Sequence, residues 1–285
     1  MKDKDVFLTV KDHSVSGEEF QLVFNEEGDM LETVPRPSLD KLPEYYKSED
    51  YISHTDNRRN FLEIVYQIIK SFALKRKLKL INSLNKGKGN LLDVGCGTGD
   101  FLKVAQQNGW QITGIEPNDK ARSMAKAKTK SKILDSQELF KLNPECFDVI
   151  SLWHVFEHLP NLEEHLVQFN KLLKPNGTLI IAVPNYNSYD AQYYKSFWAA
   201  YDVPRHLWHF SKRAITRLVK TEKMEVSKIK PMVFDSYYVS LLSEKLKGGV
   251  MKTIKAFWIG WRSNVNAKRT GEYSSLIYII KRAKT

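Results

Sequence analysis

The fold of this 285-residue chain depends on one stretch, Leu91-Leu92-Asp93-Val94-Gly95-Cys96-Gly97-Thr98-Gly99-Asp100-Phe101-Leu102. Its apolar start predicts a buried strand at 91–94, and a helix is expected to begin near Asp100. The alternate glycines between them predict a loop, because glycine adopts positive φ and lets backbone N–H groups approach a ligand closely. A strand, a glycine loop and a helix N-terminus in this order predict the binding of a nucleotide-like ligand.

Strands and helices alternate downstream of this stretch. Further strands are expected at 110–115, 133–134, 147–153 and 178–183, with helices at 100–108, 120–130 and 161–173. This alternation predicts an α/β fold, a Rossmann-like doubly wound sheet that is mostly parallel and has right-handed crossovers. Later strands at 226–234 and 273–280, with a helix at 237–246 between them, are expected to complete a seven-stranded sheet with an antiparallel last strand.

The N-terminal part is organised differently. Residues 1–55 are predicted to form an arm with a small hairpin at 18–34, and residues 56–285 the main domain, which starts with a long helix. The arm is rich in tyrosine near its end. Its rings either pack the arm onto the main domain or lie across the mouth of the ligand site, where Tyr51 or His54 would touch the ligand.

Charge is distributed unevenly along the chain. The net charge is +11, yet residues 1–50 hold 6 basic against 13 acidic side chains, and from Lys245 onward 10 basic side chains accompany one acid, Glu272. A solvated face is the simplest interpretation of the basic region. Contact with RNA or with an anionic membrane surface are the two alternatives. Phe257, Trp258, Ile259 and Trp261 either form an interfacial patch there or pack against the sheet edge.

Cysteine usage and hydropathy point to a cytoplasmic protein. Cys96 and Cys146 are the two cysteines, too few for a disulfide framework or a cysteine zinc site. No apolar run is long enough to span a membrane, and Met1–Asp5 lacks the core of a signal peptide. We therefore expect a reducing compartment.

Three later segments complete a motif set. Glu116 lies 17 residues after Gly99, where a nucleotide-binding α/β fold places an acid that accepts hydrogen bonds from ribose hydroxyls. The segments FDVISLWHVFEHLP (147–160) and LLKPNGTLII (172–181) follow it. As a set, the motifs over 91–184 resemble those of class I S-adenosylmethionine (SAM)-dependent methyltransferases. VPRHLWHFS (203–211) is similar to the signature of a bacterial group related to the ubiquinone-biosynthesis O-methyltransferases.

The resemblance implies SAM as the cofactor and assigns it a set of residues. The methionine part would lie among Asp93, Gly95, Gly97 and Gly99, with Cys96 presenting only its backbone. The resemblance also implies that Glu116 holds the ribose, that Pro117 lines the adenine, and that Ser136 or Gln137 lies at the adenine edge. Trp153 and His154 would face the sulfonium and its methyl group.

The residues His154-Val155-Phe156-Glu157-His158 also match H-x-x-E-H, the pattern of one class of zinc protease. A catalytic zinc site needs a further ligand, and no other feature indicates a protease. Ubiquinone O-methyltransferases place Glu-x-x-Glu-His here, thought to bind a divalent ion, but His154 replaces the first glutamate. We therefore expect no metal, and expect Glu157 and His158 to be structural.

The acceptor side is expected in an insertion at 185–210, interpreted as a lid or substrate region because it is aromatic and irregular. Histidine is suited to proton transfer near neutral pH, so His206 is the first candidate for general base or substrate clamp and His154 the second. Alternatively, the histidines of the insertion only satisfy its own hydrogen bonds.

Together these features predict a SAM-dependent methyltransferase that acts on a small or medium-sized acceptor, most often at oxygen and less often at carbon or nitrogen. Methyl transfer to RNA or protein through the basic C-terminal region is the first alternative, and a non-catalytic SAM-binding protein the second. An NAD-dependent oxidoreductase is disfavoured because such enzymes carry a G-x-G-x-x-G loop, whereas the loop of this chain reads G-x-G-x-G. The sequence does not identify the acceptor or the oligomeric state.

Overall fold

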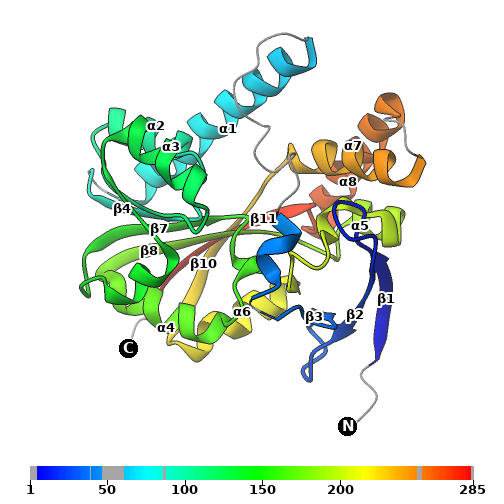
Figure 1. Ribbon diagram of the computed structural model, residues 1–285, viewed down its shortest axis with the longest axis horizontal. Helices are drawn as coiled ribbons and strands as arrows, with labels where there is room; N and C mark the ends of the chain where they lie inside the picture. The colour runs from blue at the N-terminus through cyan, green and yellow to red at the C-terminus, as the bar shows by residue number, and fades with distance from the viewer. Residues whose placement is uncertain (1–4, 39, 47–60, 86–87, 249–251, 284–285) are drawn as a thin grey trace.

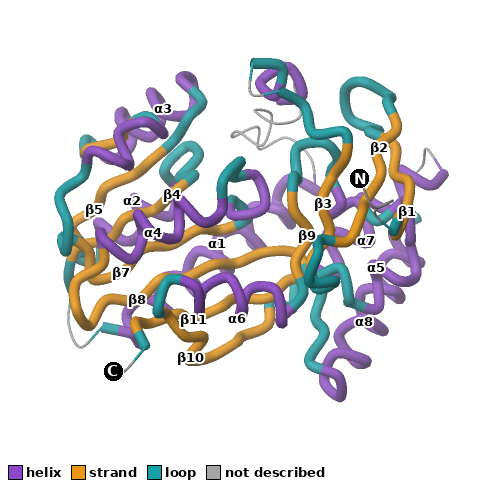
Figure 2. The backbone as a smooth tube through the Cα atoms, turned by 90° about the horizontal axis from the view of Figure 1, so that it is seen from below, coloured by secondary structure: helices purple, strands orange, loops and turns teal. Residues whose placement is uncertain are grey.

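The computed structural model describes residues 5–38, 40–46, 61–85, 88–248 and 252–283. A seven-stranded sheet runs through the molecule in the order β10-β11-β8-β7-β4-β5-β6 (Figures 1 and 2). Its strands are β4 (Asn90–Val94), β5 (Gln111–Ile115), β6 (Lys132–Leu134), β7 (Phe147–Trp153), β8 (Leu173–Pro184), β10 (Met224–Pro231) and β11 (Ser275–Arg282). Only the two pairings of β11 in this sheet are antiparallel. The predicted doubly wound fold is confirmed.

Helices cover both faces of this sheet because its strands are apolar on both sides. One face packs on α1 (Phe61–Leu84), α2 (Asp100–Gln107) and α3 (Asp119–Thr129), and the other on α4 (Leu162–Leu172) and α6 (Lys212–Thr221) (Figure 1). Neighbouring residues of β4 show the alternation. Leu91 belongs to the core beneath α1 and α2, whereas Leu92 belongs to the core beneath α4 and α6.

A second, four-stranded sheet lies beside the first, in the order β1-β2-β3-β9 (Figure 2). It contains β1 (Val6–Lys11), β2 (Glu19–Phe24), β3 (Met30–Val34) and β9 (Trp208–Phe210). The predicted hairpin is confirmed as the β2–β3 pair. The sequence predicted neither β1 nor β9, and β9 joins this sheet through partners far away in the chain, such as Met30 for Phe210.

The expectation of an irregular lid over 185–210 is wrong for most of this segment. It contains α5 (Tyr189–Tyr194), the short helices η5 (Lys195–Phe197) and η6 (Ala199–Tyr201), and then β9. Tyr194, Trp198 and Tyr201 are at most 2% exposed and form a third core with side chains of β1 and β2. The aromatic composition of the segment therefore reflects its packing against the four-stranded sheet.

The C-terminal part adds a helical pair between β10 and β11, formed by α7 (Asp235–Gly248) and α8 (Thr253–Thr270). The sequence predicted most of α7 and missed α8, whose basic and aromatic residues obscure the helical period. Within the described part of the chain, no helix has the length and apolarity needed to cross a bilayer. The proposed boundary at 55/56, Tyr51 and His54 lie outside the described residues.

Candidate active site

The glycine loop after β4 is held against the neighbouring strand by its own backbone. Gly95 N and Cys96 N both donate to Ile115 O, at 2.7 and 3.0 Å. The Cys96 side chain is 8% exposed, and its Sγ lies 2.7 Å from the position that a Cβ on Gly114 would take. Burial raises the pKa of the Cys96 thiol. Cys96 therefore offers the loop only its backbone, with an inert, neutral thiol packed inward.

The three loop glycines all have positive φ, of 69° at Gly95, 54° at Gly97 and 79° at Gly99. Their surroundings differ. A Cβ on Gly95 would lie 2.3 Å from Val155 Cγ2, and one on Gly99 would lie 2.9 Å from Ala125 Cβ. A Cβ on Gly97 would meet no described atom within 4 Å. Gly97 therefore marks the side of the loop that a ligand can approach.

Glu116 follows β5 and turns its carboxylate toward this loop. The residue is 3% exposed, and its Oε2 accepts from Gly97 N at 2.8 Å while its Oε1 accepts from Asn118 N at 3.0 Å. Burial raises the pKa of Glu116, and the two backbone N–H groups oppose that shift. Each oxygen keeps a lone pair for a further donor. The carboxylate is thus fixed next to Gly97 and suits a pair of ligand hydroxyls.

The rim beyond Glu116 is formed by exposed residues at the ends of β5 and β6. Pro117 and Ser136 are both exposed, and Ser136 begins the short helix η3 (Ser136–Lys141). Arg122 ties the rim together, because its Nη1 donates to Glu116 O at 2.6 Å and lies 3.1 Å from Asp135 Oδ2. The two residues predicted to flank an adenine therefore lie on neighbouring strand ends.

Asp93, the fourth residue of β4, is a buried acid that accepts a hydrogen bond from the neighbouring strand. It pairs in register with Ser151 of β7, whose hydroxyl donates to Asp93 Oδ1 at 2.6 Å. Burial raises the pKa of Asp93 to about 6, opposed by the Ser151 hydroxyl and by Lys77 of α1. Burial also lowers the pKa of Lys77. At neutral pH Asp93 is therefore mostly ionised and can attract a cationic group.

Trp153 lies at the end of β7, facing α1 and α2. Its ring meets Phe101 edge-on at 5.8 Å between centroids, and Lys77 Nζ lies 4.5 Å from the Trp153 ring centroid. Trp153 Nε1 is buried and has no hydrogen-bond partner among the described residues. Aromatic faces attract cations, so this ring provides an environment that suits a positively charged ligand group.

His154 continues the chain from Trp153 with a positive φ of 57°. Its Nε2 lies 3.0 Å from Asp235 Oδ2, at the start of α7, and its Nδ1 lies 3.4 Å from Glu157 Oε1. Burial opposes the charged imidazole, but the two carboxylates outweigh it and raise the pKa of His154 to about 10. His154 is therefore an imidazolium at neutral pH, with 36% of its side chain exposed.

His206 and His209 are more deeply placed, at 7% and 4% exposed. His206 Nδ1 lies 2.9 Å from Ala200 O and so carries the proton, which leaves the Nε2 lone pair directed away from that carbonyl. His209 Nε2 bonds Thr33 Oγ1 at 3.0 Å across the β3–β9 pair. Burial lowers the pKa of His209 to about 3 and that of His206 well below its usual value. Both are neutral and are weak bases.

The structure brings together a cluster that the sequence analysis did not connect. Glu157, His158 and His206 place one ligand-type atom each within 4.8 Å of one another. Glu157 is fully buried, and neither carboxylate oxygen has a hydrogen-bond partner among the described residues. His158 Nδ1 lies 2.9 Å from Arg205 O and 3.0 Å from the Tyr46 hydroxyl oxygen, which leaves its Nε2 for the cluster. Two imidazoles oriented by carbonyls and one carboxylate are a donor set that suits a divalent cation.

Three residues of this region escaped the sequence analysis. Lys77 is one of many lysines in a long helix, and Asp235 begins α7 at a position that no sequence motif marks. Of the three, Ser151 could have been found from the sequence, because pairing the parallel strands 91–94 and 149–152 in register places it opposite Asp93. The structure places the predicted cofactor residues around one end of β4, β5 and β7, and it places His206 and His209 in the neighbouring core.

Comparison with known proteins identifies related chains over part of the sequence. A family model described as "Methyltransferase domain" matches residues 65–224, more than half of the chain. An uncharacterized methyltransferase of Alkaliphilus oremlandii is 35% identical over 101 residues, which cover 34% of this chain and 47% of that protein. The ubiquinone biosynthesis O-methyltransferase of Pelagibacter ubique is 31% identical over 138 residues, covering 46% of this chain and 55% of that protein. The chain spans about half the length of these relatives.

Solved structures show the same fold. The geranyl diphosphate C-methyltransferase of Streptomyces coelicolor superposes with a TM-score of 0.58 at 13% sequence identity, covering 86% of this chain and 97% of that one. At this identity the likeness concerns the fold alone. Its extent shows that the arrangement of the seven strands and their helices is shared well beyond the residues that the family model matches.

Proposed function

The chain belongs to the family of class I methyltransferases that use S-adenosylmethionine, and on that basis we propose that it methylates a small or medium-sized acceptor. The observation that carries this proposal is the pairing of Glu116 with Gly97. A buried carboxylate held by two backbone N–H groups lies directly beside the only loop glycine with open space above it. Such a pair suits a ribose diol next to a closely approached backbone.

The residues present fit the rest of the cofactor as well. The ammonium group of the methionine part would be held by Asp93, which is ionised at neutral pH, beside the backbone of Gly95 and Gly97. The adenine would lie against the rim formed by Pro117 and Ser136. Trp153 would face the sulfonium, because it lies at the end of β7 next to the glycine loop of β4 and aromatic faces attract cations. The roles assigned by resemblance to these residues therefore stay proposals that the described geometry supports.

When bound, SAM supplies an electrophilic methyl group on a sulfonium. The protein's part is to position the acceptor in line and to control its protonation. His154 is the residue best placed for this, since it follows Trp153 and is partly exposed. Because Asp235 and Glu157 face its two ring nitrogens, it would orient an acceptor oxygen beside a fixed positive charge, and a proton lost by that oxygen would pass to solvent. We therefore propose His154 as the acceptor-side catalytic group.

His206 takes a different role in this proposal. It was the first candidate for the general base, but its lowered pKa makes it a weak proton acceptor. Its Nε2 lies 3.9 Å from Glu157 Oε1, and Glu157 in turn lies next to His154. We propose that His206 is a positioning residue that acts through Glu157. Replacing His206 with Ala should lower kcat and shift its pH profile, while leaving cofactor affinity unchanged.

The first experiment is a calorimetric titration with S-adenosylhomocysteine. We expect Glu116→Gln to raise Kd by about 10- to 100-fold, because hydrogen bonds to a charged group contribute about 1.5–3 kcal/mol. Glu138→Gln is the matched control, since Glu138 pairs with Lys141 on the exposed helix η3. Equal affinity of both variants would refute the proposed cofactor site. A labelled-methyl screen of metabolite extracts would then search for the acceptor.

A further inference from the structure

The outer surface of α8 is apolar although the helix is already packed on its inner side. Inward, small residues let it approach α7 closely, and a Cβ on Gly260 would lie 2.8 Å from the Tyr237 ring. Outward, the exposed apolar residues are Ile254 (88% exposed), Phe257 (63%), Trp258 (54%), Trp261 (43%) and Val265 (45%). Their spacing of 3, 1, 3 and 4 residues places them on one helical stripe. Ile259, which the sequence left open between such a patch and inward packing, is 3% exposed and packs inward.

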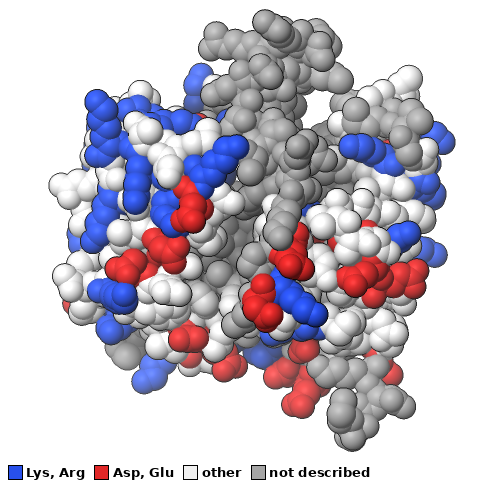
Figure 3. All heavy atoms as spheres, viewed as in Figure 1, with Lys and Arg blue, Asp and Glu red and all other residues white. Residues whose placement is uncertain are grey.

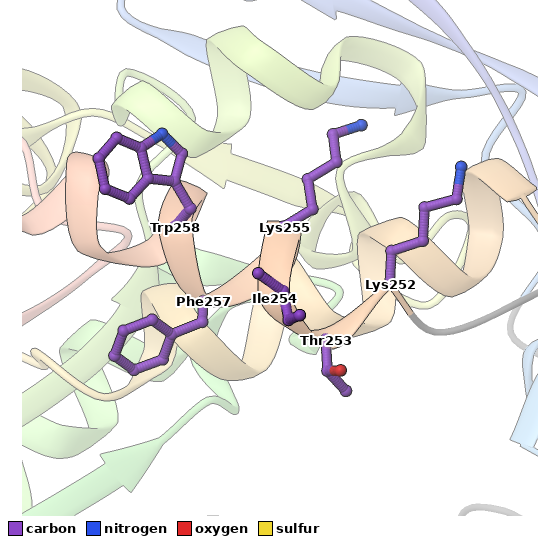
Figure 4. Close-up of a pocket in the computed structure, with 6 residues that line it drawn as sticks. All are labelled: Lys252, Thr253, Ile254, Lys255, Phe257 and Trp258. Carbon is purple, nitrogen blue, oxygen red and sulfur yellow. The ribbon is translucent and has the colours of Figure 1, made fainter.

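Figure 4 shows the first turns of this helix, where the stripe begins. A shallow hollow here is lined by Lys252, Thr253, Ile254, Lys255, Phe257 and Trp258. Trp258 and Trp261 lie 4.9 Å apart between ring centroids, and Phe257 leans on Tyr237 at 5.1 Å. These ring contacts join the large side chains into one continuous surface and leave it open to the outside.

Basic residues flank the stripe. Lys255, Arg262 and Arg269 recur every seven residues, which places them along one edge of α8, and α8 contains no acidic residue. Lys255 is partly neutralised by Glu244, whose Oε1 lies 3.0 Å from its Nζ. Lys252 and Lys268 are exposed near the two ends of the helix. Figure 3 shows Lys and Arg side chains at the α7–α8 end of the molecule. The surface is therefore both apolar and cationic.

We propose that α8 docks on an anionic lipid membrane surface, with its apolar stripe at the boundary between headgroups and acyl chains. Tryptophan and phenylalanine are favoured at this boundary, and flanking lysine and arginine side chains extend to lipid phosphates. Ile254 and Val265 argue against a single-stranded nucleic acid as the partner, because aliphatic side chains offer no stacking platform for bases. This proposal does not depend on the chemistry proposed for the active site.

The position of the helical pair gives docking a consequence. Asp235, the first residue of α7, contacts His154, so the membrane-facing pair is directly joined to the acceptor side. Phe234 and Phe72 pack edge-on at 5.3 Å beside this junction and are themselves 41% and 47% exposed. The helix proposed to dock is therefore linked to the acceptor side through α7 by a direct side-chain contact.

Vesicle cosedimentation of the full chain tests the proposal. We expect binding to phosphatidylcholine vesicles that contain phosphatidylglycerol, weaker binding at high salt, and little binding to pure phosphatidylcholine. Ile254→Glu combined with Trp258→Glu should lower the partition coefficient at least about tenfold, because charges are placed in the buried stripe. Val167→Glu is the matched control, since Val167 on α4 is 50% exposed and lies outside this surface.

Charge along the edge of α8 is tested by a separate pair of substitutions. Arg262→Gln with Arg269→Gln should weaken binding by roughly 30-fold and reduce its salt dependence, at about 1 kcal/mol for each charge near the surface. Lys126→Gln with Lys120→Gln, on the exposed face of α3, serves as the control. Every variant must bind S-adenosylhomocysteine as the unchanged chain does, which separates lost docking from lost folding and from failure of the proposed cofactor site.

Fluorescence identifies the docking helix directly. Trp110 and Trp198 are at most 3% exposed, and Trp153 and Trp208 are half-buried, so the exposed Trp258 and Trp261 should contribute most to any spectral shift on lipid binding. Trp258→Phe with Trp261→Phe should retain vesicle binding within about threefold, since apolar area is largely kept, yet lose the blue shift. A blue shift that persists in this variant would assign docking to another surface.

Three results would overturn the proposal. The first is the absence of cosedimentation at low salt, and the second is equal binding of the Ile254/Trp258 variant and the unchanged chain. The third is another occupant: a concentration-dependent dimer that the same variant dissociates, or salt-sensitive RNA binding that it abolishes while vesicle binding is absent.

Discussion

The proposed cofactor side and the proposed acceptor side of this molecule are built in opposite ways. Gly95, Gly97, Asp93 and Glu116 lie within a short stretch of chain and are joined by backbone hydrogen bonds between adjacent parallel strands. The acceptor side gathers His154, Glu157, His206 and Asp235 from segments that are far apart in the sequence.

The difference also concerns charge and burial. On the cofactor side, carboxylates are buried with donors already supplied by the backbone or by Ser151. On the acceptor side, neither oxygen of the buried Glu157 has a hydrogen-bond partner among the described residues, and the charged His154 beside it is shared with Asp235. The first arrangement is complete in itself, whereas the second depends on a ligand, a proton or a cation to balance its charge. The following predictions test that contrast.

The largest effect is expected in the glycine loop. Gly95→Ala places a Cβ 2.3 Å from Val155 Cγ2 and forces a left-handed φ on alanine. We expect the free energy of unfolding to fall by about 2–5 kcal/mol from clash and backbone strain together. Adding Val155→Ala should recover the clash component and not the strain. Chemical denaturation of the single and double variants measures both.

Gly97→Ala is the matched control for the same loop. It carries only the left-handed penalty of about 1–2 kcal/mol, because no described atom lies near its Cβ. Its Cβ would instead project into the space assigned to the cofactor, so S-adenosylhomocysteine affinity should fall more than stability does. If Gly97→Ala bound normally, the loop would not face the ligand.

The contrast explains how much the sequence could predict. The central sheet, the loop and Glu116 follow from local periodicity and spacing, and the structure confirms the fold that they imply. By contrast, β9 pairs with a strand about 180 residues earlier, and no local pattern specifies that partner. The aromatic residues of 185–201 gave a composition without a period, so their packing against the four-stranded sheet was interpreted as a lid.

The same reasoning applies to single site residues. His154 was found because it follows Trp153 within a motif, but its partner Asp235 comes from the start of α7. His206 was singled out by residue type, and its burial depends on contacts that no motif encodes. Long-range packing therefore decides the protonation state of each acceptor-side group, and protonation decides its chemistry.

The second effect is a loss of stability in acid, caused by the buried neutral histidines. The pKa of His209 is about 3 in the folded chain, below the ordinary 6.5, so only the unfolded chain gains its proton as pH falls below 6.5. At pH 5 this removes about 2 kcal/mol from the free energy of unfolding relative to pH 7. Urea denaturation at the two pH values should show a smaller loss of the free energy of unfolding in His209→Gln than in the unchanged chain. A variant of the exposed His13 should show the same loss as the unchanged chain. A stability that is flat from pH 7 to pH 5 would contradict the burial of His209.

The third effect is a pH dependence of cofactor binding. The pKa of Asp93 is raised to about 6, so the carboxylate is neutralised as pH falls below that value and its attraction for an ammonium group is lost. Affinity for S-adenosylhomocysteine should fall about tenfold between pH 7 and pH 5. Asp93→Asn should bind weakly at both values. Asp148→Asn, which changes an acid bonded to Asn90 N and Lys174 at the start of β7, should keep the pH dependence.

The smallest effect concerns the Glu157, His158 and His206 cluster, which can be balanced by a cation or by a proton. A divalent cation such as Mn²⁺, present at three times its Kd, should stabilise the chain by about 0.8 kcal/mol, a rise in Tm of about 2 °C. Glu157→Gln removes the charge and one ligand, so its Tm should not respond to the metal.

The matched control is His165→Gln on α4, a half-buried histidine that bonds Asn161 O and lies outside the cluster, which should leave the response intact. A Tm that is unmoved by Mn²⁺ in the unchanged chain, together with a higher Tm for Glu157→Gln, would show that the buried carboxylate is simply uncompensated. His154 would then be the charged group beside that carboxylate, and the pH profile of methyl transfer should follow the ionisation of His154.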